Sequence, residues 1–274
     1  MKKRILAMTL ALCTFTCSAF AEQAAAEKYR NILQSGKYYV EYEFDTVKQT
    51  LAVADNKRMN YTVYKNKGNS GLAMGLGLIN PLFAIGALLG GGSKNPTAYY
   101  EDGKYYQFSG KKKAMLATEQ QLDDPNIDPT EGWGAVKYNL ALPEELAVFA
   151  PNDMFYQATN GAGQPAFVES GTTVVKDKTL IYDKYSYSVK SMTGKELYAK
   201  NFYMYYKEGE LDKIMTYVSY RGGQEELIRV VEIKEITDVL PENALKMPEG
   251  CKVYAVGLGD MNDLLDQPVQ VETY

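Results

Sequence analysis

The stretch LYAKNFYMYYKEGELDKIMTYVSYRGGQEELIRVVEIKEI, residues 197–236, decides the fold of this chain. It holds three segments rich in aromatic and β-branched residues, which favour strands, and short turns that contain glycine separate them. Because connections this short join only antiparallel neighbours, the stretch predicts an antiparallel meander. Its strands are expected at Leu197–Tyr206, Leu211–Tyr220 and Leu227–Ile236.

Period-2 alternation predicts further strands. In Tyr38–Phe44 the aromatic and aliphatic residues fall on one face and two glutamates on the other, which is typical of a strand with one wet face. Asp102-Gly103 is a hairpin signal, because both residues tolerate positive φ. Besides Tyr38–Phe44, strands are expected at Lys48–Ala54, Arg58–Tyr64, Thr97–Glu101, Lys104–Phe108 and around Tyr185–Val189.

Helices are few in this pattern. Gln23–Gln34 has helical spacing and ends at Ser35-Gly36, and Leu142–Phe149 is the best candidate for a second helix. Residues 120–133 are expected to form a loop, and residues 255–274 an acidic tail without a strand pattern. No βαβ spacing is present, so a parallel sheet is not expected.

The N-terminus predicts export. Basic residues 2–4 precede the apolar run Ile5–Phe15, which has the length of a signal-peptide core, and Ala19-Phe20-Ala21 supplies small residues for cleavage. Cleavage after Ala21 would place the mature chain outside the cytoplasm, in the periplasm.

A lipoprotein signal is the alternative, but Leu12 and Thr16, the residues before Cys13 and Cys17, are not small. Cleavage would leave Cys251 alone, expected as a small buried hydrophobe.

Composition excludes several function classes. The chain carries a net charge of −4, and loss of the three basic residues of the signal leaves about −7, which argues against nucleic acid as a partner. It has no histidine, so the usual general base and the commonest zinc ligand are missing. No nucleophile, nucleotide or metal motif is convincing. We therefore expect no enzyme activity, no cofactor and no metal site.

An apolar insertion separates two expected strands. Residues 69–93 form a run of 25 uncharged residues, rich in glycine, with Asn80-Pro81 in the middle. A single membrane span would put strands of one sheet on opposite sides of the bilayer, so three interpretations remain: a lid over an apolar groove, a buried core hairpin, or a loop that dips into one leaflet and makes transient membrane contact. The lid candidates are Leu72, Met74, Leu76, Leu78, Ile79, Leu82, Phe83, Ile85, Leu88 and Leu89.

The order of four segments along the chain resembles the periplasmic lipoprotein-carrier superfamily. These segments are the helix Gln23–Gln34, the strand that follows it, the meander of residues 197–236, and the closing segment Leu245–Val253 with its Pro248-Glu249-Gly250 turn. That superfamily includes LolA, LolB, LppX-type proteins and RseB. The resemblance covers residues 23–254. It implies an α+β fold in which an N-terminal helix and a helical, apolar lid cover a strongly curved, open antiparallel sheet, an incomplete barrel.

The sequence therefore predicts a signal peptide at residues 1–21, one half-barrel-like domain at 22–254 with the insertion at 69–93, and a tail at 255–274. The expected function is that of a soluble periplasmic carrier that shields a lipid or acylated ligand. A protein-interaction or envelope-stress sensing module on the same fold is the alternative, and a hydrolase that uses carboxylates alone is a third. The groove candidates are Tyr38, Val40, Tyr42, Phe44, Tyr185, Tyr187, Val189, Phe202, Met204 and Tyr206.

Overall fold

The chain forms two compact units, and each is described by itself. Unit 1 comprises residues 26–34, 145–151 and most of 164–233, and unit 2 the remaining described residues. The structure is a computed structural model, and it describes residues 26–45, 47–64, 95–122, 133–153, 155, 164–175, 178–255 and 269–274.

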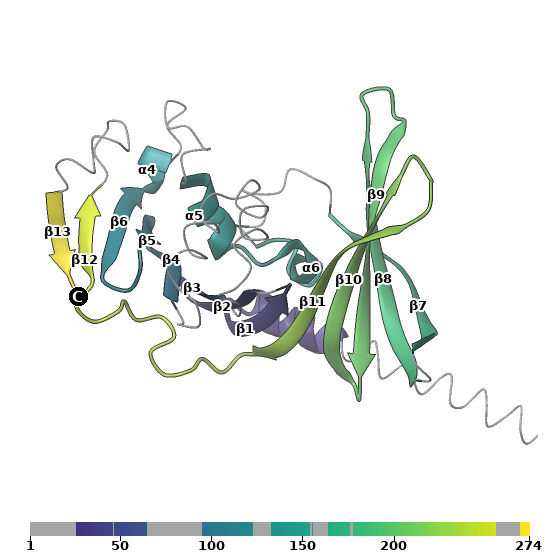
Figure 1. The fold of residues 1–274 in the computed structure, drawn as a ribbon, viewed down its shortest axis with the longest axis horizontal. Helices are drawn as coiled ribbons and strands as arrows, with labels where there is room; N and C mark the ends of the chain where they lie inside the picture. The colour runs from purple at the N-terminus through teal and green to yellow at the C-terminus, as the bar shows by residue number, and fades with distance from the viewer. Residues whose placement is uncertain are drawn as a thin grey trace, which may run out of the picture. The chain divides into compact units, whose positions relative to one another are not determined.

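Unit 1 is built on an antiparallel sheet with the order β11-β10-β9-β8-β7, drawn in green in Figure 1. The turn between β9 and β10 is tight, and Glu208 and Gly209 both adopt positive φ there, at 54° and 82°. The strands are β7 (Ala166–Val175), β8 (Lys178–Lys190), β9 (Glu196–Lys207), β10 (Glu210–Tyr220) and β11 (Glu226–Thr237), the last of which enters unit 2 at Lys234.

Two short helical segments complete unit 1. Residues 26–34 are helical, and they bury Tyr29 and Leu33 on one side while Lys28 stays exposed. The second segment is α6 (Glu144–Ala147), which begins directly after Pro143. The residue that precedes a proline is biased away from helical φ and ψ, so the helix expected at Leu142–Phe149 starts two residues later.

Unit 2 is a longer sheet with the order β13-β12-β6-β5-β4-β3-β2-β1. All its pairings are antiparallel except that of β12 with β6, which is parallel. The elements are β1 (Lys37–Phe44), β2 (Val47–Ala54), β3 (Lys57–Tyr64), β4 (Asn95–Glu101), β5 (Lys104–Phe108), β6 (Lys113–Thr118), α4 (Glu119–Leu122), α5 (Trp133–Leu140), β12 (Lys252–Ala255) and β13 (Val269–Thr273).

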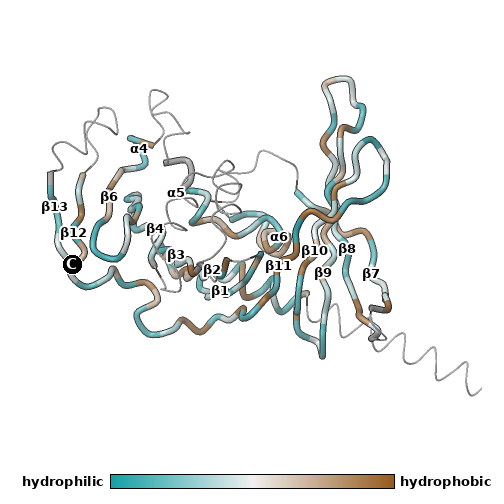
Figure 2. Tube along the Cα trace, in the orientation of Figure 1, coloured by the Kyte–Doolittle hydropathy of each residue, from teal (hydrophilic) through white to brown (hydrophobic). Residues whose placement is uncertain are grey.

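The sheet of unit 2 has a hydrophobic cluster on each face. On one face Tyr100 and Tyr105 pack with Val136 and Leu140 of α5 and with Phe155. On the other face Tyr99, Tyr106 and Cys251 form a second cluster, against which Leu245 and Met247 pack. These two residues belong to the connection between β11 and β12, along which Figure 2 shows several hydrophobic positions.

The structure confirms a mostly antiparallel, open sheet with few helices. Every strand expected from the sequence is present to within a few residues. Three expectations were wrong. One strand pair is parallel, the loop expected at residues 120–133 begins inside α4 and ends at the first residue of α5, and residues 269–273 of the expected tail form an edge strand. The parallel pair has no local pattern in the sequence, because β6 and β12 lie far apart in the chain.

Candidate functional site

Six of the ten predicted groove residues lie on one face of unit 1. In the ladder between β8 and β9, Tyr185 lies opposite Phe202, so alternate residues of both strands share that side. Five of them are buried and Val189 is half-buried. The face continues onto β10, where Ile214 lies opposite Met204. We call the set the aromatic face; its predicted members are Tyr185, Tyr187, Val189, Phe202, Met204 and Tyr206.

The aromatic face is covered by the helix at residues 26–34 and by the segment that follows α6. The Tyr29 ring lies 5.9 Å from the Phe149 ring, and Phe149 in turn packs edge-on against Tyr185 at 6.4 Å. The side-chain amide of Gln34 donates a hydrogen bond to the Phe149 carbonyl at 2.8 Å. The helix and the segment after α6 therefore form one cover, joined by the ring contact between Tyr29 and Phe149 and by the hydrogen bond from Gln34.

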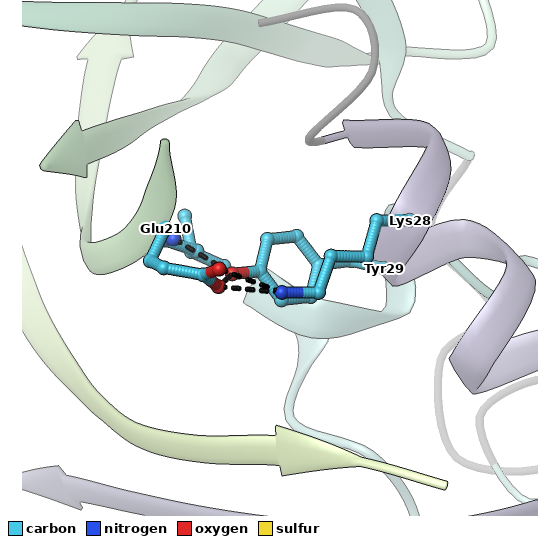
Figure 3. Close-up of polar contacts among 4 residues, drawn as sticks. Lys28, Tyr29 and Glu210 are labelled. Atoms are coloured by element: carbon cyan, nitrogen blue, oxygen red, sulfur yellow. Dashed lines mark hydrogen bonds and ion pairs between the residues drawn. The ribbon is translucent and has the colours of Figure 1, made fainter. Parts of the chain in front are cut away.

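A polar contact attaches the helix to the β9–β10 hairpin (Figure 3). The Tyr29 hydroxyl donates to Oε2 of Glu210 at 2.5 Å and accepts from the backbone N–H of Leu211 at 2.9 Å. Lys28 Nζ lies 2.7 and 2.8 Å from the two carboxylate oxygens. Hydrogen bonds from Lys28 and then Tyr29 lower the pKa of Glu210, so the carboxylate stays charged at neutral pH.

A carboxylate is buried within the aromatic face itself. Asp183 accepts a hydrogen bond from Ser170 at 2.5 Å through Oδ1 and one from Tyr206 at 3.1 Å through Oδ2. Burial, and then the charge of Asp183, raises the pKa of Tyr206, so this phenol remains a donor. Buried charges need such partners, and here they come from two neighbouring strands.

A second buried carboxylate belongs to the cover. Glu145 of α6 is fully buried, and its Oε1 accepts a hydrogen bond from Thr216 at 3.1 Å. Arg229 Nη1 lies 3.4 Å from the same oxygen, and its side chain is 38% exposed. Because Thr216 and Arg229 are opposite each other on β10 and β11, α6 is fixed over this part of the sheet.

The aromatic face extends beyond its cover. At the β7 edge, Phe167 is 57% exposed although its ring packs 5.6 Å from Tyr185. At the far end of the hairpins, Tyr220 is 62% exposed and lies opposite Tyr198 on the same side, with ring centroids 6.4 Å apart. Between these points Lys200 Nζ lies 5.9 Å from the Tyr187 ring.

The other four predicted groove residues lie in unit 2, on one face of β1. Tyr38, Val40 and Tyr42 are buried and Phe44 is half-buried. The Tyr42 hydroxyl donates to Gln49 Oε1 at 2.7 Å, across the β1–β2 ladder. The aromatic rings of Tyr42 and Phe44 stack at 6.2 Å, so these residues pack with one another along the strand.

Sequence reasoning missed a buried ion pair on the same face. Arg58 Nη2 lies 2.6 Å from Asp153 Oδ2, and Nη1 donates to the Leu140 carbonyl at 3.1 Å. The guanidinium carbon lies 4.4 Å from the centroid of the Phe155 ring. Alternation in β3 places Arg58 on the same side as Asn60 and Thr62, so the sequence marks this side of the strand as polar and does not reveal that Arg58 is buried.

The lid candidates of residues 72–89 lie outside the described residues. Within the described ranges, His, Cys, Asp and Glu side chains nowhere form a group of three or more suited to a metal ion. No helix in the same part of the chain has the length and hydropathy needed to cross a membrane.

Comparison with known proteins gives matches among solved structures but no sequence relative. No family model and no curated protein matches the chain. A LolA superfamily protein from Nitrosomonas europaea shares 9% identity at a TM-score of 0.31, over 82% of this chain and 97% of that one. A protein from Parabacteroides distasonis described as a putative lipoprotein shares 12% identity at a TM-score of 0.23, over 74% of this chain and 96% of that one.

Proposed function

We propose that this chain is a non-enzymatic carrier that holds the acyl chain of a lipid or lipid-modified ligand against the aromatic face of unit 1. The observation that carries the proposal is that this face is larger than its cover: Phe167 and Tyr220 remain exposed at its two ends. An acyl chain that lies along such a face gains about 0.8 kcal/mol for each CH₂ group that it buries.

The ligand must compete with the cover. Tyr29 and Phe149 fill the centre of the face, so an acyl chain displaces one of these rings or lies beside it. The lid of residues 72–89 belongs to the same proposal, as does the remaining groove set Tyr38, Val40, Tyr42 and Phe44. We also propose the organisation expected from the sequence, with a signal peptide at 1–21, one ligand-binding domain at 22–254, and a periplasmic location; the acidic segment at 255–274 ends in β13.

The test uses the exposed ends of the face, because changes there leave the buried core intact. The full chain is purified, stripped of lipid and titrated with a fluorescent fatty acid. Phe167→Ser with Tyr220→Ser should weaken binding of the probe. Leu227→Ser is the matched control, since Leu227 is 48% exposed but lies opposite Tyr217 on the other side of the sheet.

Equal losses in the double variant and the control, or no saturable binding by the wild type, would overturn the carrier. Native mass spectrometry of protein isolated from membranes gives an independent measurement, because a carrier should retain co-purifying lipid.

A second candidate is a protein-interaction module with a filled core. It is favoured by the near-complete burial of Tyr185, Phe202 and Met204 beneath the protein's own side chains. Large apolar side chains are exposed along the hairpins, among them Leu197, Leu227 and Ile228. For this candidate the Leu227→Ser variant should lose a protein partner, while no lipid should co-purify.

A further inference from the structure

A cavity of about 200 Å³ lies on the face of unit 2 opposite α5. Its floor comes from three adjacent strands, with Tyr39 from β1, Thr50 and Ala52 from β2, and Tyr61 from β3. Its wall is the turn at residues 241–244, which is closed by a hydrogen bond from the Ala244 N–H to the Pro241 carbonyl at 3.1 Å. All these residues belong to unit 2.

The strand register explains the hollow. Thr50 pairs with Tyr61 on one side, and Ala52 pairs with Tyr39 on the other, so two small side chains lie between two large rings. Strands two apart in a sheet are separated by roughly 10 Å. The rings therefore stand on either side of a gap that one small group can fill.

The electrostatics of the hollow favour a cation. Glu242, which is exposed on the wall, is the charged residue among those lining it. Lys48 lies two residues from Thr50 on β2, but its Nζ is 2.5 Å from Glu41 and so is already paired. The Tyr39 hydroxyl donates to the other oxygen of Glu41 at 3.2 Å.

The two rings are suited to cation–π contacts. Burial, and then the charge of Glu41, raises the pKa of Tyr39 to about 12, and burial raises that of Tyr61. Both phenols therefore stay neutral at physiological pH, and their rings keep the π character that a cation–π contact needs. An aromatic pair beside a carboxylate recognises organic ammonium groups, while an anion would find no free cation among the residues that line this hollow.

We propose that this hollow binds a small organic ammonium group between Tyr39 and Tyr61, with Glu242 at the rim. The group is a methylated amine such as free choline or the head group of a choline lipid. The site does not depend on the proposed acyl-chain site, because the residues that line the hollow include none of the groove candidates of that proposal.

The test measures binding of choline to the full chain by calorimetry or by NMR, against the neutral isostere in which carbon replaces nitrogen. The isostere should bind about 3- to 30-fold more weakly, the range that a cation–π contact supports. Tyr61→Leu and Glu242→Gln should each weaken choline binding. Glu249→Gln is the matched control, since Glu249 is exposed in the same segment but does not line the hollow.

Tyr61 packs against a hydrophobic cluster, so its removal can disturb folding. Ala52→Leu keeps the ring and fills the floor instead, and should abolish choline binding while the unfolding transition stays cooperative. Equal affinity for choline and the isostere, no saturable binding, or equal losses in Glu242→Gln and Glu249→Gln would overturn the site.

Vesicles distinguish the two sources of the ammonium group. Binding to phosphatidylcholine vesicles that choline competes away supports a lipid head group, and choline binding without vesicle binding supports a free amine. Vesicle binding that choline does not affect, together with no binding of free choline, overturns the site. Fatty-acid binding should be unchanged in Ala52→Leu, so failure here and failure of the carrier proposal can be told apart.

Discussion

The phenolic oxygen of Tyr29 lies 2.5 Å from Oε2 of Glu210 and also accepts the backbone N–H of Leu211. One side chain of the N-terminal helix thus satisfies both a carboxylate and a buried amide at the start of β10. Burial, and then the hydrogen bond to Glu210, raises the pKa of Tyr29 well above its usual value. The helix is therefore attached to the sheet mainly through this residue.

Tyr29→Phe should loosen the cover of the aromatic face. The variant leaves the buried Leu211 N–H without its acceptor, which costs about 1–3 kcal/mol in the free energy of unfolding. Binding of a hydrophobic dye should rise because the ring contact with Phe149 weakens. Urea denaturation and dye fluorescence measure both effects.

Lys28→Met is the control for that variant. The Lys28–Glu210 pair is solvent-exposed on both sides, so its loss should change the free energy of unfolding by only about 0–1 kcal/mol. An effect as large as that of Tyr29→Phe would show that the ion pair, and not the phenol, holds the helix.

Removal of one partner of the buried ion pair in unit 2 should be costly. Arg58→Met leaves Asp153, whose side chain is 5% exposed, as an uncompensated charge, and we expect a loss of about 3–5 kcal/mol. Arg58→Met combined with Asp153→Leu should recover much of the loss, since both charges are then gone. Denaturant unfolding of the two single variants and the double variant gives the coupling energy, and additive losses would contradict this interpretation.

Local chemistry explains which parts of the fold were predictable. The hairpins follow from Asp55, Asp102 and Glu208, which adopt positive φ at the turns, and from the alternation in β1, which Tyr39 interrupts. Strand β7 has a weaker pattern because Gly171 interrupts it. A Cβ at Gly171 would lie 2.6 Å from the Tyr182 hydroxyl, so the glycine makes room for a ring from the next strand. That requirement is invisible without the pairing.

The site is predictable only in part for the same reason. Alternation correctly places Tyr185 on one side of β8 and Phe202 on the same side of β9. It cannot place Asp153 against Arg58, or Glu145 against Thr216, because these partners lie far apart in the chain and meet only in the folded state. The polar contacts that hold the covers in position were therefore missed.

The buried thiol should behave as part of the core. Cys251 lies in a hydrophobic cluster with Tyr99 and Tyr106, and burial raises the pKa of its thiol. Cys251→Ser should destabilise the chain by about 1–3 kcal/mol, because a hydroxyl replaces an apolar contact there. Fatty-acid binding should be unchanged. A thiol reagent should label the native protein slowly and the unfolded protein at once; fast native labelling would contradict the buried position.

Stability should fall at alkaline pH. Burial, and then the charge of Glu41, raises the pKa of Tyr39 from 10.0 to about 12. Burial, and then the nearby phenol of Tyr217, raises the pKa of Tyr205 to about 12 as well. Between these values the unfolded chain loses protons that the folded chain keeps, so the stability present below pH 10 is lost as the pH rises toward about 12. Tyrosinate absorbance should rise in two steps, the second together with unfolding by circular dichroism. A single rise of the absorbance at about pH 10, the ordinary pKa of tyrosine, would contradict the raised pKa values.

Replacement of residues 69–93 by a short Gly/Ser linker tests the role of the insertion. Strands β3 and β4, which flank the insertion, are antiparallel neighbours in which Thr62 pairs with Asn95, so a short connection can join the two strands. Loop length itself changes the closure entropy little, by about 0.6 kcal/mol for each doubling.

If the insertion is a lid, the variant should therefore remain folded and rich in β-structure, while dye binding rises and retention of fatty acid falls. If the insertion is core, the variant should unfold, because each buried Leu or Ile that is lost costs about 2–5 kcal/mol, and a few such losses exceed the stability of a typical domain. If the insertion dips into a leaflet, the wild type should float with liposomes and the variant should not. Circular dichroism, dye binding and liposome flotation on one variant thus give a different result for each role, and an unfolded variant would end the lid proposal.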